Sequence, residues 1–256
     1  MRVLIVRETS PRRPALEVAV SHALVERVNE GALGPVLRLY RPAPTLAFGR
    51  IDALRPGFAV AAAAAREHGF EPVVRAPGGH AVAYHTGCLG IDELLPEADP
   101  IAGMQDRFAR SARVLAAALR DLGVDARVGR VPGEFCPGEF TVNARGAVKL
   151  VGTAQRVVRR ASLLAASLAV RDADALRDVL DDVYRALELA WDPATAGGVV
   201  DEVAGVTVDA IERAVVKAYA SEWELVEASL DAGTLQRAHA LLPRHEVAEA
   251  RLRDAS

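Results

Sequence analysis

We predict an α+β fold in which helices flank a mixed or antiparallel sheet. Short apolar segments typical of strands follow one another along the chain, and only three longer segments with helical spacing interrupt them. A doubly wound fold would alternate strands and helices regularly, so this order favours the α+β class. From residue 172 on, apolar residues recur only at helical spacing. We therefore expect one mixed body, residues 1–171, and a small helical C-terminal extension, residues 172–256.

The first part of the body is predicted to contain three strands and two helices. An apolar run of four residues between charged ones predicts a strand over residues 2–7. Residues 14–29 have apolar side chains at helical spacing and begin with a proline, which is typical of a helix start. Two strands, 36–40 and 45–48, follow on either side of a proline-rich turn, and a helix over 59–68 ends at a glycine.

The remaining elements follow from the same two spacings. A long amphipathic helix is predicted over residues 101–122, where a glycine closes it. The strands expected in this part are 72–75, 81–84, 88–93, 126–128, 140–143, 148–158 and 162–170. The helices expected in the extension are 174–188, 207–219 and 232–241.

Composition argues against several classes of partner. The net charge of −3 and the 5% aromatic content give no pull toward nucleic acid or an anionic membrane. No stretch approaches the roughly 18–20 apolar residues of a membrane span, and the start of the chain does not resemble a secretory signal, so we expect a cytoplasmic protein. The two cysteines, Cys88 and Cys136, form no CxxC pair, and no ligand spacing predicts a metal site.

Lysine is rare in this chain, which makes one lysine a candidate functional residue. Of the 31 Lys plus Arg residues, only Lys149 and Lys217 are lysines. An ammonium is a compact point charge with three donors, which a planar guanidinium does not imitate. Lys149 lies in a predicted strand between two glycines, Gly146 and Gly152. An ordinary exposed strand lysine is the alternative.

A Pro-Gly-Gly loop between two predicted strands is the second candidate. Adjacent glycines, Gly78 and Gly79, allow the backbone to come close to a ligand, and Arg75 just before them offers a fork for an anionic group. The spacing is neither that of a P-loop nor that of GxGxxG. A plain turn between strands is the alternative here.

Together these two motifs resemble those of the lipoate–protein ligase and octanoyltransferase superfamily, which includes the biotin–protein ligases. The positions that match the first family signature are Arg75, Gly78, Gly79, Ala81, Val82, Gly87 and Leu89. Those that match the second are Lys149, Gly152, Ala154 and Gln155. The resemblance covers about residues 1–170 and implies a fold like that of class II aminoacyl-tRNA synthetases. The departures are Val74 for the first arginine, His80 for the third glycine, Ala83-Tyr84-His85 for Tyr-His-Asp, and Cys88 for asparagine.

The resemblance implies attachment of lipoate or octanoate to a lysine of a carrier domain through an acyl-adenylate, with ATP and Mg²⁺. The implied partners are lipoyl carrier domains of 2-oxoacid dehydrogenases or of the glycine cleavage protein, and a separate accessory subunit. Lys149 would stabilise the negative charge on the acyl carbonyl oxygen. The implied substrate-binding residues are Arg75, Gly78, Gly79, His80, Ala81, Tyr84, His85, Gly152, Thr153 and Ala154.

Two alternatives remain open at this point. Cys136 lies in a turn-rich loop 13 residues before Lys149, where some octanoyltransferases of this superfamily carry a nucleophilic cysteine. In that case the acyl group would come from acyl carrier protein, and no cofactor would be needed. The other alternative, from a different class, is a non-catalytic homologue that binds an acyl ligand or a carrier.

Overall fold

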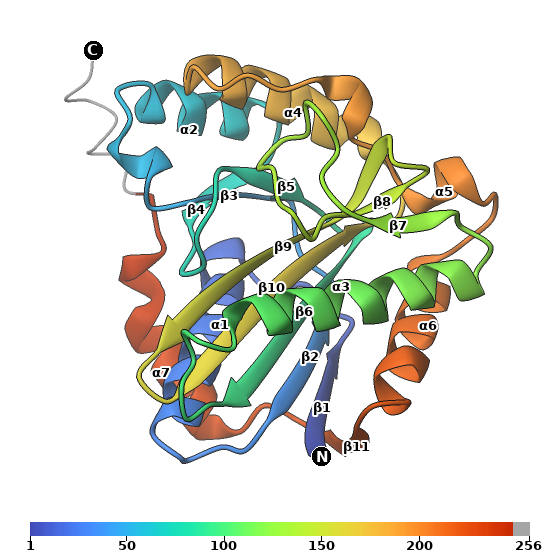
Figure 1. Ribbon diagram of the computed structural model, residues 1–256. Helices are drawn as coiled ribbons and strands as arrows, with labels where there is room; N and C mark the ends of the chain where they lie inside the picture. The colour runs from blue at the N-terminus through green and yellow to red at the C-terminus, as the bar shows by residue number, and fades with distance from the viewer. Residues whose placement is uncertain (248–256) are drawn as a thin grey trace.

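An eight-stranded mixed sheet forms the centre of the molecule. The computed structural model describes residues 1–247 of the 256. In space the strands run in the order β11-β1-β2-β6-β10-β9-β8-β7 (Figure 1). Their bounds are β1 (Arg2–Glu8), β2 (Val36–Tyr40), β6 (Cys88–Pro96), β7 (Ala126–Val128), β8 (Val142–Ala144), β9 (Val148–Val158), β10 (Ala161–Ala169) and β11 (Glu224–Ala228). Strands β11, β1 and β2 are parallel, and the other pairs are antiparallel.

Two pairs of helices cover the faces of this sheet. Helices α3 (Met104–Asp121) and α6 (Val208–Ala220) pack against each other on one face, and α1 (Pro14–Asn29) packs with α7 (Ala232–Leu241) on the other (Figure 1). Apolar side chains from each pair meet the sheet in separate buried clusters. This burial supplies most of the stability of such a layered fold.

A smaller unit lies above one end of the large sheet. Three strands form it in the order β4-β3-β5, with bounds β4 (Glu71–Val74), β3 (Thr45–Phe48) and β5 (Val82–Tyr84). Helices α2 (Phe58–Glu67) and α4 (Ala173–Ala186) pack together over it (Figure 1). A third apolar cluster joins these helices to the small sheet. The space between the small sheet and the large one holds the site described below.

The sequence-based expectations are largely confirmed, with one correction. The predicted strands and helices of the body all occur, with boundaries that differ by a few residues. The expectation of an entirely helical extension after residue 172 is wrong, because β11 lies within it and pairs with β1. Without β11, β1 would be an unpaired sheet edge. The helices of this segment pack on α1, α2 and α3, so they complete the body's cores.

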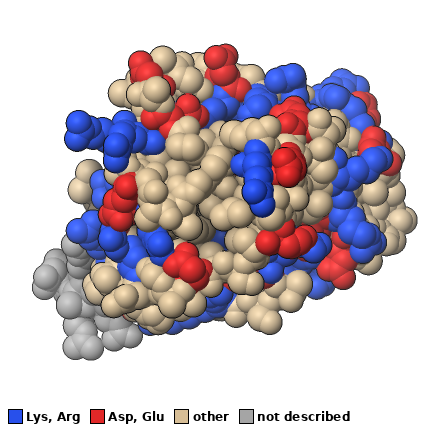
Figure 2. All heavy atoms as spheres, turned by 90° about the horizontal axis from the view of Figure 1, so that it is seen from below, with Lys and Arg blue, Asp and Glu red and all other residues tan. Residues whose placement is uncertain are grey.

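Two further features concern the molecule as a whole. In the part of the chain that the structure describes, no helix is both long and apolar enough to cross a membrane. On the face shown in Figure 2, acidic and basic side chains are interspersed. Elsewhere in the described structure, charged side chains form ion pairs between elements, such as those of Arg237 with Glu26 and Glu30.

Candidate active site

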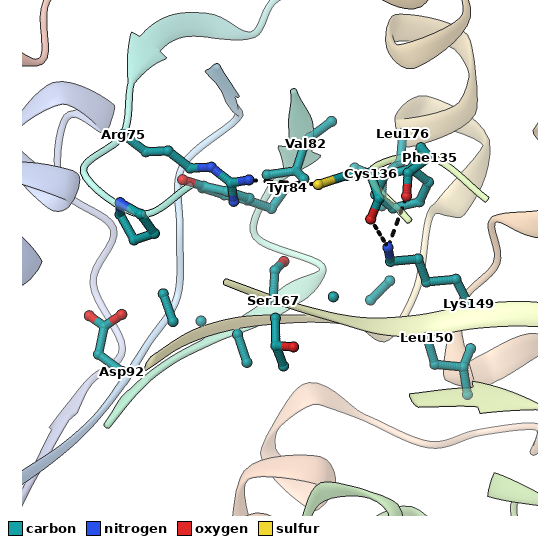
Figure 3. Close-up of a pocket in the computed structure, with 18 of the residues that line it drawn as sticks. Arg75, Val82, Tyr84, Asp92, Phe135, Cys136, Lys149, Leu150, Ser167 and Leu176 are labelled. Carbon is teal, nitrogen blue, oxygen red and sulfur yellow. Dashed lines mark hydrogen bonds between the residues drawn. The ribbon is translucent and has the colours of Figure 1, made fainter. Parts of the chain in front are cut away.

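A pocket lies between the large sheet and the small one (Figure 3). Strands β6, β9 and β10 form its floor, where small side chains leave room: Gly90, Gly152, Ala165, Ala166 and Ser167. Its upper wall comes from Val82 and Tyr84 of β5, from Leu176 of α4, and from the loops that carry Arg75 and Cys136. Such a concave, mostly apolar space with a few convergent polar groups is typical of a small-ligand site.

A buried carboxylate organises the loop that carries Cys136. Glu134 has no exposed side-chain surface, although it lies in a Pro/Gly-rich turn. Its Oε1 accepts hydrogen bonds from the N–H groups of Val131, at 3.1 Å, and Gly138, at 3.4 Å. Its Oε2 accepts one from the Thr141 hydroxyl at 2.7 Å. These contacts hold the two ends of the loop together.

Lys149 is bound to the same loop by an ion pair and two hydrogen bonds. Its ammonium forms an ion pair with Glu134, with an Nζ–Oε2 distance of 2.8 Å. It also donates to the carbonyl oxygens of Phe135 and Cys136, both at 2.9 Å (Figure 3). The absence of a side chain at Gly152 leaves room for the lysine stem, since a Cβ there would lie 3.1 Å from its Cε. A role of Lys149 at an acyl carbonyl therefore requires one of these contacts to open.

Cys136 is held in a backbone conformation that non-glycine residues rarely adopt. Its φ is +40°, which costs on the order of 1–3 kcal/mol and persists only where the surroundings enforce it. Its N–H donates to the Tyr184 hydroxyl at 2.8 Å, and that hydroxyl donates to the carbonyl oxygen of Ala81 at 3.0 Å. Burial raises the pKa of Tyr184, which keeps this hydroxyl protonated. The hydrogen bonds through the Tyr184 hydroxyl therefore hold Cys136 in this conformation.

The sulfur of Cys136 faces hydrogen-bond donors. The His80 N–H donates to Sγ at 3.2 Å, and Arg75 Nη2 lies 3.8 Å from Sγ (Figure 3). Arg75 Nε is buried with no hydrogen-bond partner in the described part of the chain. A glycine at position 79 permits this approach, since its φ is +91° and a Cβ would lie 2.8 Å from Sγ. Donors directed at a sulfur stabilise negative charge there, as a nucleophilic cysteine requires.

The second cysteine is in a different environment. Cys88 is fully buried at the start of β6, and burial raises its pKa to about 12. A thiol of this kind stays protonated and behaves as a small apolar side chain. Cys136 is thus the cysteine that is placed for chemistry.

The structure brings six of the predicted site residues to the pocket wall. These are Arg75, Tyr84, Cys136, Lys149, Gly152 and Thr153. Three more lie next to Cys136 without lining the pocket. The His80 N–H donates to its sulfur, the Ala81 carbonyl accepts from the Tyr184 hydroxyl, and Gly79 leaves room for the sulfur.

The other expected residues do not line the pocket. Gly78 bonds through its N–H to the carbonyl of Gln155, and Ala154 is buried in β9. The His80 ring bonds to Asp52, with 2.8 Å between Nδ1 and Oδ1. His85 Nδ1 accepts from the Gly87 N–H at 2.8 Å, and its Nε2 donates to the Asp172 carbonyl, so His85 fixes a turn.

Sequence reasoning missed several residues that shape the site. Glu134 and Tyr184 hold the cysteine loop, while Ser21, Tyr40 and Asp92 line the pocket at a distance from that loop. One signal was present for Asp92, because two adjacent acidic residues interrupt the apolar run of β6. The burial of Glu134 left no such signal, since a glutamate in a turn is ordinarily exposed.

The adenylate route requires a cation for the phosphate of ATP. Lys149, a cation that lines the pocket, already forms an ion pair with Glu134 and donates to two carbonyl oxygens of its own loop. A role of Lys149 at a nucleotide phosphate would therefore also require one of these contacts to open. In the described residues, no group of three or more His, Cys, Asp or Glu side chains is arranged to hold a metal ion.

The fold matches that of known proteins. A putative lipoate protein ligase from T. acidophilum with bound lipoic acid has a TM-score of 0.76 and 20% identity, covering 95% of this chain and 96% of that one. A structure of lipoate-protein ligase A bound with ATP has a TM-score of 0.72 and 19% identity, covering 95% of both chains. These likenesses define the class: the fold is that of the lipoate–protein ligases.

The sequence comparison then places the chain in a family. The profile of the lipoyl protein ligase A/B catalytic domain matches residues 13–220, so the chain belongs to this family. An octanoyl-[GcvH]:protein N-octanoyltransferase of Geobacillus kaustophilus is 29% identical over 159 residues, which is 62% of this chain and 56% of that protein. The corresponding protein of Oceanobacillus iheyensis is 27% identical over 221 residues, 82% of this chain and 78% of that protein. The chain thus spans little more than half of the first relative.

Proposed function

We propose that this protein transfers a lipoyl or octanoyl group to a lysine of a lipoyl carrier domain through a thioester on Cys136. The observation that carries the proposal is the position of the Cys136 sulfur, at the pocket wall and within reach of the His80 N–H and Arg75. Of the two routes expected from the sequence, this is the one without ATP. The named activity of the similar octanoyltransferases supports it.

The reaction has two steps of acyl exchange. In the first, the Cys136 sulfur attacks the acyl carbon, a C–S bond forms, and the bond to the donor carrier breaks while the donor atom takes up the thiol proton. In the second, the lysine amine of the acceptor domain attacks the thioester, an amide forms, and the sulfur leaves and regains a proton. The His80 N–H and Arg75 Nη2, which face the sulfur, stabilise negative charge on Sγ before it attacks in the first step and as it leaves in the second.

The donor is proposed to be an octanoylated carrier domain of the glycine cleavage H type, and the acceptor a second lipoyl domain. The activity for which the relatives are named, octanoyl transfer from GcvH to protein, supports this donor. The acyl chain would lie over the small residues of the pocket floor, from Gly152 and Ser167 toward Gly90.

Intact-mass spectrometry tests the proposal. The protein is mixed with an octanoylated glycine cleavage protein, with octanoyl-acyl carrier protein, or with octanoate and ATP, each with and without an apo lipoyl domain. We expect an octanoyl adduct on the protein that is absent in Cys136→Ser and retained in Cys88→Ala, followed by its transfer to the lipoyl domain. Transfer only in the ATP reaction, unaffected by Cys136→Ser, would establish the ligase route instead. Absence of transfer from every donor would leave a homologue that binds without catalysis.

A further inference from the structure

The end of the pocket away from Cys136 is polar. Asp92 of β6 lies there, on the opposite side of the view from Lys149 and Cys136, and its carboxylate points into the space below Arg75 (Figure 3). Ser21 of α1 and Tyr40 of β2 line the same pocket. A pocket that served only an alkyl chain would be expected to end in apolar side chains.

One oxygen of Asp92 lacks a partner. The side chain is 1% exposed. Its Oδ2 accepts hydrogen bonds from the Ser21 hydroxyl at 2.6 Å and from Arg38 Nη1 at 3.3 Å. Its Oδ1 is buried and has no hydrogen-bond partner among residues 1–247. Buried polar atoms are nearly always paired, so an unpartnered oxygen on a side chain that lines the pocket indicates a partner supplied by the ligand.

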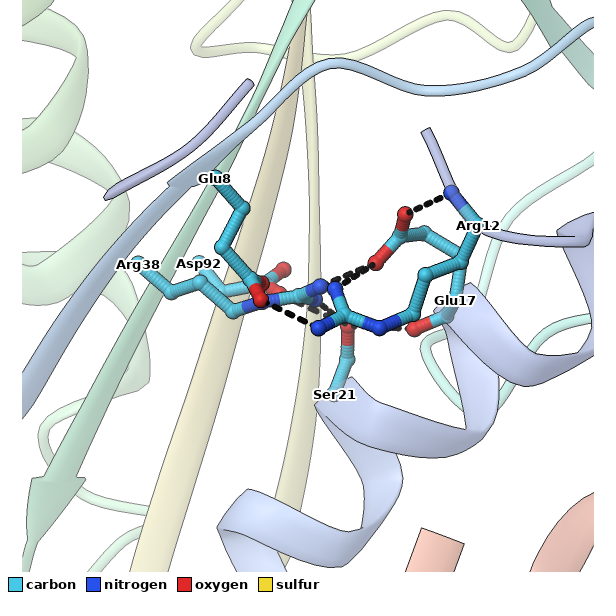
Figure 4. A network of polar contacts seen from close by, with 6 residues as sticks. All are labelled: Glu8, Arg12, Glu17, Ser21, Arg38 and Asp92. Carbon is cyan, nitrogen blue, oxygen red and sulfur yellow. Dashed lines mark hydrogen bonds and ion pairs between the residues drawn. The ribbon is translucent and has the colours of Figure 1, made fainter. Parts of the chain in front are cut away.

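The neighbouring residues among those described do not donate a hydrogen bond to this oxygen. Arg38 is fully buried beside it, and its donors are shared among Asp92, Glu17 and Glu8, the last at 2.7 Å (Figure 4). Burial raises the pKa of Asp92, against the opposing effect of Arg38. This network fixes the position of the carboxyl group while it leaves Oδ1 free.

Two tyrosines add further polar groups near Asp92. Burial raises the pKa of Tyr40 and of Tyr84, and the charge of Asp92 contributes in both cases. Their hydroxyls therefore remain protonated and able to donate. In Figure 3 the Tyr84 hydroxyl is directed away from Cys136 and toward the side of Asp92. The pocket thus combines a sulfur at one end with a set of donors and acceptors at the other.

We propose that this polar end binds the distal end of an acyl chain that carries a hydroxyl or thiol group, and that the pocket prefers such a chain to a plain octanoyl chain. Both groups donate and accept hydrogen bonds, so either satisfies Oδ1 whether Asp92 is ionised or protonated. A methyl end would leave Oδ1 without a hydrogen-bond donor. Sites built to hydrogen-bond a ligand reject the analogue that lacks the bonding group. This inference rests on the proposed function in taking the occupant of the pocket to be an acyl chain, and it narrows that function, since a plain octanoyl chain would be accepted as the weaker ligand.

Calorimetric titration with two amides, octanamide and 8-hydroxyoctanamide, tests the proposal on the full chain. A hydrogen bond to a buried carboxyl group predicts about 10-fold or more tighter binding of the hydroxylated amide. We expect Asp92→Leu to abolish that ratio. Glu17→Gln is the matched control, because Glu17 bonds Arg38 in the same network but does not line the pocket, and it should retain the ratio.

The outcomes separate this inference from the proposed function. Equal affinity of the wild-type protein for the two amides, or no binding of the hydroxylated one, would overturn the inference without any need for a variant. A preference that survives Asp92→Leu in a protein that still unfolds cooperatively would overturn it as well. Amide binding requires no reaction at Cys136, so a clear preference in a protein that transfers no acyl group would refute only the proposed transfer.

Discussion

Replacing Glu134 by glutamine tests the ion pair that fixes the cysteine loop. The carboxylate has two oxygens with separate tasks: Oε1 accepts two backbone N–H groups, and Oε2 accepts Lys149 and Thr141. A glutamine has one oxygen and one NH₂ group. In either orientation, its NH₂ faces donors that it cannot satisfy.

The magnitude follows from the burial of the pair. The side chains of Lys149 and Glu134 are 3% and 0% exposed, and the variant leaves the ammonium without its carboxylate. Removal of one partner of a buried pair costs about 3–5 kcal/mol. Because two carbonyl oxygens still accept from Lys149, we expect the lower part of this range, about 3 kcal/mol. For a chain of this size, that corresponds to a fall in Tm of roughly 6–12 °C.

Urea unfolding and calorimetry measure the effect. The chain's only other lysine offers the matched control, since Lys217 pairs with Asp121 at 2.7 Å with side chains that are 77% and 54% exposed. Asp121→Asn should change the free energy of unfolding by less than about 0.5 kcal/mol. If Glu134→Gln costs less than about 1 kcal/mol, or no more than the control, the loop does not depend on this ion pair and the reasoning fails.

Three further predictions concern the site and its surroundings. Gly79→Ala should destabilise the protein by at least about 1 kcal/mol and slow acylation of Cys136, because the φ of residue 79 is +91° and the added Cβ would meet Sγ. Gly78→Ala is the control and should have neither effect, because a Cβ at residue 78 meets nothing within 4 Å. Iodoacetamide at pH 8 should add one label, at Cys136, while Cys88 stays unlabelled in the folded protein because its pKa is raised to about 12; two labels on the native protein would contradict this. Burial lowers the pKa of His22 from 6.5 to about 4, so the unfolded chain binds a proton at this residue more readily than the folded chain does. The free energy of unfolding should therefore fall by up to about 3 kcal/mol as the pH drops from about 6.5 to 4. The same acid dependence in His22→Asn would refute this origin.

Most of the fold could be predicted because its elements leave local signals. The strands of the body carry short apolar runs, and the helices carry apolar residues at a period of 3.6. Strand β11 could not be recognised this way. It has five residues, two of them glutamates, and none of the five is fully buried. Its strand conformation comes from pairing with β1, a contact that the local sequence does not reveal.

The site was only partly predictable for a similar reason. The rarity of lysine pointed to Lys149, and the spacing pointed to Cys136, and both lie at the pocket. Their connection runs through backbone carbonyls and through Glu134, whose burial depends on the whole fold. His85 shows the reverse case, since its position beside the glycine motif predicted substrate contact and the structure uses it to close a turn.

The pairing of β1 with β11 bears on how the chain is made. Arg2 of β1 lies opposite Glu224 of β11, so β1 receives this neighbour only after more than two hundred further residues have been synthesised. Until then, one side of β1 presents unpaired N–H and C=O groups, a template on which other nascent chains can add strands. A truncated chain that ends near residue 171 would keep Cys136 and Lys149, yet it would expose this edge permanently and should aggregate. Among residues 1–247, β11 is the last strand to be synthesised, and its pairing with β1 removes this exposed edge.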